Sequence, residues 1–363
     1  MIQYLVILLD DTSVSFCHYT NDKQERDLMP LETLKAGIVY AMKENLNIQF
    51  VYPNYSLPKD YLEVIDSIDH MDIKPASLGA EADVVVMDGI YQLPNANDND
   101  FKQGVSYVLR LSKHELFEEI ANVSALLNKV ERLNVVITDV ENFKDADFER
   151  YSEVLRMLLE EVEKLYVAGK VVLLNLLTDR MMLEKMNNCG AGDTSITLAP
   201  DGKFYVCPAF YLTDENDGMG ALHTSIGDVK SGLDIKNSQL YKLDHAPLCR
   251  HCDAYQCKRC IWLNRKMTYE VNTPSHEQCV MAHLERNASR ELLNAIRKHG
   301  TFLPEQEEIK EITYLDPFDV RTVWEGNMCI FNRKIVWQQE KWWGRLPQKR
   351  RMKSKSCLSV AMA

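Results

Sequence analysis

The stretch 134–177, NVVITDVENFKDADFERYSEVLRMLLEEVEKLYVAGKVVLLNLL, has two apolar runs on either side of one long helical pattern. Runs as apolar as 134–140 and 171–177 suit strands that are buried on both faces, as in a parallel sheet. Between them, apolar residues recur at steps of three and four, which predicts an amphipathic helix over 145–168. That face carries Phe148, Tyr151, Leu155, Leu158, Val162 and Leu165.

Similar apolar runs occur nearer the N-terminus, at 4–10, 48–52, 82–88 and 105–111. Helical patterns follow several of them, near 31–46, 60–68 and 113–133. Strand and helix alternate to about residue 180, which predicts an α/β fold with right-handed crossovers, either a barrel or an open doubly wound sheet. The alternation does not choose between these two, and in both the site forms from loops at the carboxyl ends of the strands.

The composition argues against nucleic-acid-coating, secreted and membrane-spanning proteins. The chain has 363 residues and a formal net charge of -11, which argues against a protein that coats nucleic acid. The N-terminal run lacks a basic start and a small-residue cleavage site, so we interpret it as a strand rather than a signal peptide. No window approaches the roughly 20 apolar residues of a membrane helix. We therefore expect a cytoplasmic protein without a membrane partner, whose clustered cysteines bind metal rather than form disulfides.

The character of the sequence changes at Cys189. Residues 189–210 predict a β-hairpin, with Pro200, Asp201 and Gly202 in the turn. A strong helix is predicted over 275–299, with Ser275 and Gln278 as a capping box. We divide the chain into an α/β domain at 1–185, a small cysteine-rich α+β domain at 186–300, and an extension at 301–363. The extension ends in a basic tail that we expect to be disordered, without a nucleic-acid role.

The cysteines are unevenly distributed. Two CX2C pairs occur in CRHCDAYQCKRC at 249–260, and this spacing lets two thiolates approach one metal ion or cluster. Gly190 and Gly192 allow the backbone close to whatever Cys189 binds. Seven of the ten cysteines lie between 189 and 279, namely Cys189, Cys207, Cys249, Cys252, Cys257, Cys260 and Cys279.

Spacing alone leaves the kind of metal open. One tetrahedral zinc uses four cysteines and leaves three unexplained. Two zinc ions need eight ligands, and two iron–sulfur clusters need about as many. The candidates for an eighth ligand to zinc are His245, His251, His276 and His283.

The seven cysteines resemble the SPASM domain, which closes many radical S-adenosylmethionine (radical SAM) enzymes that modify ribosomally made peptides. Twelve residues separate Cys189 from Gly202, which fits the family pattern, and four more precede Cys207. The central quartet, CX2CX4CX2C, is one residue shorter than the family's CX2CX5CX3C in each of its last two intervals. The resemblance covers about 189–285 and implies two auxiliary 4Fe–4S clusters.

The resemblance also implies which cysteines hold which cluster. Carried over by position, Cys189, Cys207 and Cys260 hold the first cluster. The second cluster is held by Cys249, Cys252, Cys257 and Cys279.

The cluster that binds S-adenosylmethionine in radical SAM enzymes needs CX3CX2C after the first strand. The corresponding stretch here, DDTSVSFCHYTNDKQ at 10–24, contains Cys17 alone. One thiolate cannot hold a 4Fe–4S cluster, so we expect neither S-adenosylmethionine as a cofactor nor its reductive cleavage. The α/β region thus resembles a partial radical SAM barrel without its cofactor motif.

A more detailed resemblance is to the CXXX repeat peptide maturase family, over about 1–316. It rests on LLDDTSVSFCHY, LMPLETLKAGIVYAMKENLNIQFVYP and the cysteine-rich region. It implies maturation of a ribosomal precursor peptide with spaced cysteines, either by this chain or together with a second maturation protein. The alternatives are a scaffold that binds the peptide without catalysis, and a structural protein stabilised by zinc.

For residues at the end of the first apolar run and after it, the sequence allows a functional and a structural interpretation. Cys17, beside His18, is either a nucleophile or redox partner of substrate thiols, or an incidental loop cysteine. Adjacent residues on an extended chain point to opposite faces, which argues against a Cys17–His18 pair. Asp10 and Asp11 either line the functional mouth or form a turn. Surface or tail thiols are expected at Cys329 and Cys357.

Overall fold

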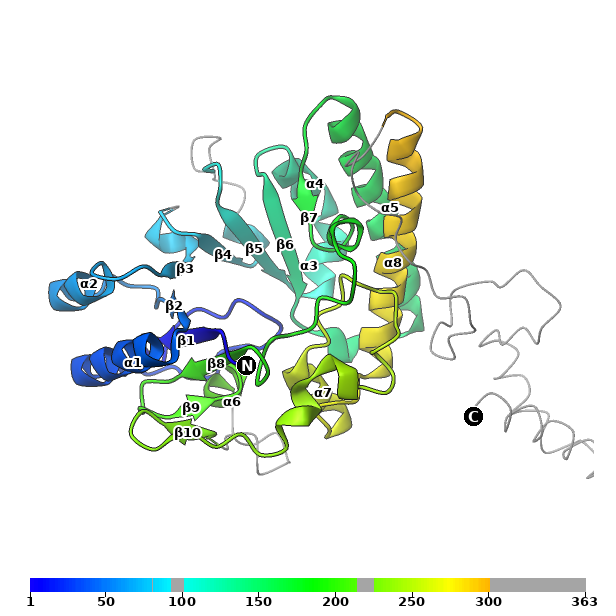
Figure 1. Ribbon diagram of the computed structural model, residues 1–363. Coiled ribbons are helices and arrows are strands. Elements are labelled where there is room, and N and C mark those ends of the chain that lie inside the picture. Colours follow the sequence, from blue (N-terminus) through cyan, green and yellow to red (C-terminus); the bar gives the residue numbers. More distant parts are fainter. Residues whose placement is uncertain (80, 93–100, 214–224, 301–363) are drawn as a thin grey trace, which may run out of the picture. The chain divides into compact units, whose positions relative to one another are not determined.

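The computed structural model describes residues 1–79, 81–92, 101–213 and 225–300. Its main feature is a sheet of nine strands in the order β7-β6-β5-β4-β3-β2-β1-β8-β9 (Figure 1). The strands are β1 Tyr4–Leu8, β2 Asn47–Val51, β3 Met71–Pro75, β4 Val84–Asp88, β5 Ser106–Leu111, β6 Arg132–Ile137, β7 Leu173–Leu174, β8 Ser195–Leu198 and β9 Phe204–Tyr205.

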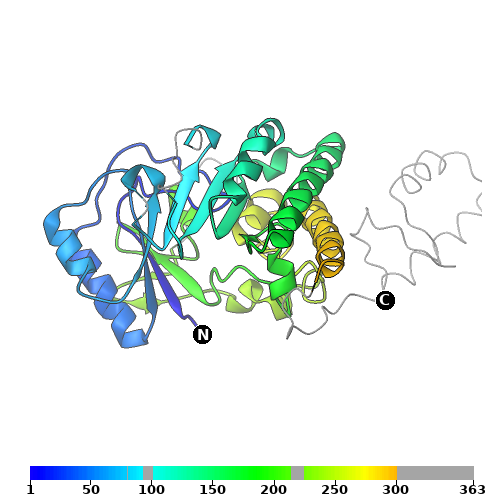
Figure 2. The same ribbon diagram turned by 90° about the horizontal axis from the view of Figure 1, so that it is seen from above.

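Strands β1 to β7 are parallel and lie side by side in chain order. A doubly wound sheet reverses its strand order at a switch point, and no reversal occurs here. The sheet ends at β7 on one side and at β9 on the other, so in the described residues it does not close. The predicted α/β fold with a partial barrel is confirmed, and Figure 2 shows the strands from above.

The helices of this region follow the strands, as expected for crossover connections. The apolar face predicted over 145–168 is buried in α5, with Phe148 and Leu158 almost fully shielded from solvent. The helix predicted over 113–133 is divided in two, because the backbone of Glu119 leaves the helical region at φ -108°. The helices are α1 Leu31–Glu44, α2 Lys59–Ile65, α3 Lys113–Glu118, α4 Ile120–Leu127 and α5 Asp145–Val167.

Alternate side chains of β1 have different environments. Tyr4 and Val6 point toward the inside of the partial barrel, where they line a cavity. Leu5 and Ile7 point the other way and are fully buried. The predicted continuous burial of this strand is confirmed.

The cysteine-rich region begins as part of the main sheet. The hairpin predicted over 189–210 is confirmed, since β8 and β9 pair antiparallel with Thr197 opposite Tyr205. The turn places Gly202 at φ +78°, a backbone conformation that favours glycine. On its other side β8 pairs parallel with β1, with Ile196 opposite Leu5. The barrel and the cysteine-rich region therefore share one sheet, within a compact unit over Met1–Ile312.

The rest of the cysteine-rich region is mostly helix and turn. Helix α8 lies along α5 in both views (Figures 1 and 2). It begins after Ser275, whose hydroxyl accepts the N–H of Gln278 at 3.2 Å, so the hydroxyl half of the predicted capping box is present. Helix α7, directly after Cys260, was not predicted. The remaining elements are α6 Ala209–Leu212, β10 Gly227–Asp228, β11 Gly232–Leu233, α7 Ile261–Thr268 and α8 His276–Arg297.

Two further points concern the chain as a whole. Among the described residues, no helix combines the length and apolar character needed to cross a membrane. The predicted extension at 301–363, with Cys329, Cys357 and the basic tail, lies outside the described residues.

A buried ionic network connects the cysteine hub at 249–260 to the rest of the molecule. Asp253 is 1% exposed and accepts hydrogen bonds from Arg286 at 3.0 Å and from Arg290 at 2.7 Å, both on α8. Arg180, in the segment after β7, donates to the backbone carbonyl of Asp253 at 2.9 Å and lies 3.6 Å from its carboxylate. Asp253 thus links the hub, α8 and the end of the barrel.

Replacing Asp253 with Asn should destabilise the protein severely. The substitution removes a buried carboxylate from ion pairs with buried guanidinium groups, and breaking a buried pair in this way costs about 3–5 kcal/mol. Chemical denaturation should show a lower midpoint for Asp253→Asn, measured anaerobically against wild type. Asp234→Asn is the matched control, because the Asp234–Lys236 pair is exposed and its loss should leave the midpoint unchanged. Equal midpoints for wild type and Asp253→Asn would contradict the structural role of this network.

Candidate functional site

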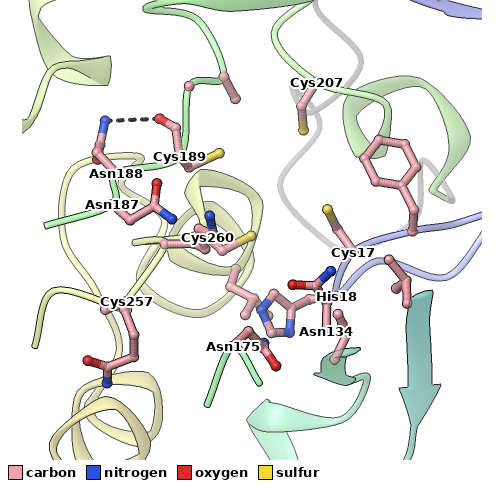
Figure 3. Close-up of a pocket in the computed structure, with 18 of the residues that line it drawn as sticks. Cys17, His18, Asn134, Asn175, Asn187, Asn188, Cys189, Cys207, Cys257 and Cys260 are labelled. Atoms are coloured by element: carbon pink, nitrogen blue, oxygen red, sulfur yellow. Dashed lines mark hydrogen bonds between the residues drawn. The ribbon is translucent and has the colours of Figure 1, made fainter. Parts of the chain in front are cut away.

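A cavity of about 630 Å³ lies on the inner side of the partial barrel. Its walls come from β1, β2, β5, β6 and β8, and from the cysteine-rich segments 187–191, 207–208 and 256–260. Figure 3 shows that Cys17, Cys189, Cys207 and Cys260 face this space from different segments. We call these four residues the first thiol group.

The members of the first thiol group are close enough to influence one another. Each of the six pairs among them interacts electrostatically, so ionisation of one thiol opposes ionisation of the others. Burial, followed by the charge of Cys189, raises the pKa of Cys17 to about 12. The same two causes raise the pKa values of Cys207 and Cys260. As free thiols these groups stay protonated at neutral pH, whereas metal binding would deprotonate them.

Backbone hydrogen bonds place the cysteine-rich members of this group. The N–H of Cys189 donates to the carbonyl of Lys258 at 2.6 Å, which brings the hairpin against the hub. Cys260 is the N-cap residue of α7, and its side chain makes no capping hydrogen bond. The backbone N–H groups of Ala209 and Phe210 act to lower the pKa of Cys207, against the larger raising effect of burial. This lowering effect favours the thiolate form, which is the form that binds metal.

The loop that carries Cys17 is held by two strands of the barrel. Arg110, a β5 residue that is 2% exposed, donates from Nε to the carbonyl of Cys17 at 3.0 Å and from Nη2 to that of Tyr19 at 2.6 Å. His18 Nδ1 forms a hydrogen bond with the carbonyl of Ile137, at the end of β6, at 2.8 Å. This loop therefore has a defined position relative to the sheet.

The side chains of Cys17 and His18 are arranged differently from the prediction made from the sequence. Opposite directions were predicted for the two side chains, yet both line the cavity (Figure 3). The reason is that 17–18 is part of an irregular loop rather than an extended strand. Burial lowers the pKa of His18. The raised pKa of Cys17 disfavours the thiolate that a nucleophile requires, so the loop does not activate Cys17 as a free nucleophile.

Three further predicted ligands pack around one small buried cluster. Cys249 is buried beside Met186 and Ala246, with Cys252 and Cys257 packed against the same cluster. Cys257 also lines the cavity that the first thiol group faces. Burial and the charge of Cys249 raise the pKa of Cys257 to about 12, against the lowering effect of the Arg259 N–H. Together with Cys279 we call these residues the second thiol group.

Helix α8 brings Cys279 to the same side as the hub. Its residue His283 has Nε2 3.7 Å from the sulfur of Cys252. Cys279 lies four residues earlier on α8, and residues at this spacing share a helix face. The backbone N–H of Ala254 donates to Cys252 at 3.5 Å and that of Arg259 donates to Cys257 at 3.4 Å. Such N–H···S bonds tune metal-bound sulfur.

A buried arginine lies between the two thiol groups. Arg259 is fully buried, has φ +46°, and donates to Asn188 at 2.7 Å, to Asn272 at 2.9 Å and to the carbonyl of Tyr241 at 2.7 Å. Burial lowers the pKa of Arg259, and the charges of Cys249, Cys189 and Cys257 oppose that shift. A cation at this position stabilises negative charge on either group.

The donor sets fit iron–sulfur clusters. The ligands are thiols, several of them line one cavity, and backbone N–H groups donate to the sulfurs of Cys252 and Cys257. Within the described residues, no three His, Cys, Asp or Glu side chains lie close enough to share a single metal ion. The predicted seven ligands and their division into clusters remain predictions.

The other loop residues considered from the sequence have structural partners. Asp10 accepts the N–H of Thr12 at 2.7 Å and the hydroxyl of Tyr55 at 2.7 Å. Asp11 pairs with Lys23 at 2.9 Å and accepts the hydroxyl of Tyr211 at 2.5 Å. Neither carboxylate lines the cavity. Gly190 and Gly192 form a tight turn, and Gly192 at φ +75° approaches the ring of Tyr241.

Sequence reasoning missed polar residues on the α8 side of the cavity. Glu285 accepts the hydroxyl of Tyr151 at 2.7 Å and the side-chain N–H of Gln256 at 3.2 Å. Burial raises the pKa of Glu285 to about 7, against the lowering effect of these two bonds. The buried side-chain oxygens of Gln256 and Gln278 have no hydrogen-bond partner in the described structure. The sequence marked Gln278 only as a capping residue and did not mark Glu285 or Gln256, because their roles at the cavity depend on tertiary contacts.

Comparison with solved structures identifies the fold. The chain matches anSMEcpe, an anaerobic sulfatase-maturating enzyme of the radical SAM/SPASM type, solved with bound S-adenosylmethionine. The TM-score is 0.55 at 11% identity, covering 82% of this chain and 96% of the enzyme. The fold is that of a radical SAM enzyme.

Two further solved structures align with the chain to different extents. The structure of anSMEcpe with S-adenosylmethionine and the Cp18Cys peptide aligns at TM-score 0.55 and 14% identity, covering 81% of this chain and 99% of the enzyme. SuiB from Streptococcus suis, bound to S-adenosylmethionine, aligns at TM-score 0.37 and 14% identity, over 66% of this chain and 65% of SuiB. No protein-family model and no curated protein sequence matches the chain.

The raised pKa of Glu285 predicts a pH-dependent stability difference. The unfolded carboxyl ionises near its ordinary pKa, while the folded one stays neutral until about pH 7. The stability that this carboxyl group contributes is therefore fully present at acid pH and is lost as pH rises toward 7. The glutamine of Glu285→Gln does not ionise, so the variant avoids this loss. Its free energy of unfolding, relative to that of wild type, should be about 2 kcal/mol higher at pH 8 than at pH 5.5.

Anaerobic denaturation of both proteins at the two pH values provides the measurement. The control is Glu63→Gln, which changes an exposed carboxylate on α2. An advantage of Glu285→Gln that is equal at both pH values would contradict the raised pKa.

Proposed function

We propose that this chain is a peptide-maturation protein whose cysteine-rich region binds two 4Fe–4S clusters. The observation that supports the proposal is that Cys189, Cys207 and Cys260 line the cavity of a partial barrel similar in fold to anSMEcpe, while Cys249, Cys252 and Cys257 pack around one buried cluster nearby in the sequence. When bound, the clusters supply one-electron chemistry or hold the fold together. The proposed substrate is a ribosomal precursor peptide with repeated cysteines.

Buried charge supports iron–sulfur clusters bound by thiolates. Arg180, Arg259 and Arg286 are at most 1% exposed, and Asp253 is the carboxylate that accepts from two of them. The charge of Cys252 acts on Arg180, and those of Cys189, Cys249 and Cys257 act on Arg259. Thiolates bound to clusters would place negative charge beside these buried guanidinium groups, where the two charges attract.

The polar side of the cavity supports a peptide ligand. The unpartnered side-chain oxygens of Gln256 and Gln278 can accept hydrogen bonds, and both residues line the cavity. A peptide backbone offers N–H donors that suit such acceptors. The proposal of a peptide partner also draws on the similar fold of anSMEcpe, which was solved with a bound peptide.

Conventional cleavage of S-adenosylmethionine is not part of the proposal. The loop after β1 holds Cys17 alone, where a radical SAM cluster requires three thiolates. This difference favours a second candidate, in which the chain binds the precursor peptide and presents it to another maturation protein. The cavity and its polar side serve either role.

Metal analysis tests the clusters and their division. Protein purified anaerobically should be brown and contain about eight irons per chain, the number expected for two 4Fe–4S clusters. Cys252→Ala and Cys260→Ala should each impair one cluster, and the two variants should lose different EPR signals after reduction. A colourless protein with zinc would exclude the iron–sulfur proposal, and loss of the same signal in both variants would contradict the division.

Incubation with a peptide separates the catalytic role from the scaffold role. The reduced protein is mixed with a synthetic Cys-repeat peptide, and the peptide mass is followed by mass spectrometry. A mass shift without a second protein would reject the scaffold. Binding without a mass shift, measured by calorimetry, would support the scaffold. Gln278→Leu should weaken binding several-fold in both cases, because it removes a buried acceptor. Unchanged affinity in this variant would exclude Gln278 as a peptide contact.

A further inference from the structure

We infer that Cys17 is the fourth protein ligand of the first cluster, so that this cluster is bonded to the barrel as well as to the cysteine-rich region. This inference rests on the proposed iron–sulfur function and names a ligand outside the seven-cysteine pattern. Cys189, Cys207 and Cys260 supply three thiolates, and a 4Fe–4S cluster takes four.

The first observation is the position of the four thiols. Cys17 lines the same cavity as the other three, and Figure 3 shows its side chain turned toward the space that they surround. Cys17 interacts electrostatically with each of the other three. Four thiols from three distant parts of the sequence thus face one cavity.

The second observation is how firmly the Cys17 loop is attached. Arg110 binds the carbonyls of Cys17 and Tyr19, and its own Nη1 is 2.8 Å from Asp88. The ring of Tyr19 packs edge-on against Trp262 of α7, with centroids 6.5 Å apart. Tyr19 is two residues after Cys17, and Trp262 is two residues after Cys260. The two cysteines are therefore connected by packing as well as by the cavity, and a ligand held in this way is preorganised.

Two other residues of the cavity wall could compete with Cys17. Cys257 also lines the cavity, but it packs against Met186, Ala246 and Cys249 and belongs to the second thiol group. His18 also lines the cavity, and imidazole can ligate iron. Its Nδ1 is engaged with the carbonyl of Ile137, so any ligation would use Nε2. The chemistry of the set favours Cys17, because four thiolates are the usual ligands of such clusters.

Ligation by Cys17 has a consequence for the proposed function. With Cys17 in place, all four irons of the first cluster have protein ligands. The cluster then has no open iron for a substrate thiol, and it joins the loop after β1 to the hairpin and the hub. Cys17 is in this sense a ligand rather than a nucleophile.

The test compares the full-length wild type with Cys17→Ala and His18→Ala, all prepared anaerobically and reduced. Iron content and EPR spectra are recorded with and without added cyanide, which binds an open iron. The signal of the first cluster is the one that Cys260→Ala loses. In Cys17→Ala this signal should be absent, with about four irons lost, or shifted and sensitive to cyanide. In wild type and His18→Ala it should remain and be insensitive to cyanide.

The outcomes distinguish this inference from the proposed function. Wild-type protein without iron would overturn both. Eight irons and an unchanged first-cluster signal in Cys17→Ala would overturn only the ligand assignment, and so would a cyanide-sensitive signal in wild type. The wild-type measurement decides the question even if Cys17→Ala fails to fold. Retention of the second-cluster signal and of the far-UV circular dichroism spectrum shows that a variant is folded.

Discussion

The interaction on which much of this structure depends is the contact of one buried carboxylate with three arginines. Asp253 joins Arg180 from the end of the barrel to Arg286 and Arg290 from α8. Because Asp253 lies inside the cysteine hub, the hub's position is set by charge as well as by packing. The charge of Cys252 acts on Arg180, so thiolates of the hub would add negative charge beside this network.

The elements predicted from the sequence are those with a strong local pattern. Continuous apolar runs indicated β1, β2, β4, β5 and β6, because strands buried on both faces contain few polar residues. Strand β3, MDIKP, was missed because Asp72 and Lys74 alternate with buried residues and form an ion pair at 2.5 Å. The predicted run at 171–177 shrank to a two-residue strand at Leu173–Leu174, since the chain turns at 175–178.

The candidate site could be predicted only in part. Paired spacing made the cysteines of the hub conspicuous, because neighbouring ligands leave a local signature. The position of Cys17 at the cavity has no such local signature. It depends on a hydrogen bond from Arg110, which is 93 residues away in the chain. The same holds for Glu285, whose contact with Tyr151 spans 134 residues. A sequence shows ligands that lie close together along the chain, but not those that the fold brings together.

The parallel pairing of β8 with β1 has a consequence for how the chain is made. Strand β1 is synthesised well before the neighbour on one of its edges, because β8 begins only at Ser195. Until then β1 can pair only with β2, and its other edge presents free backbone groups on a fully apolar strand. Exposed edges of this kind promote aggregation, and pairing over such a distance is slow. The period of synthesis between the barrel and the hairpin is therefore when the nascent chain depends most on chaperones.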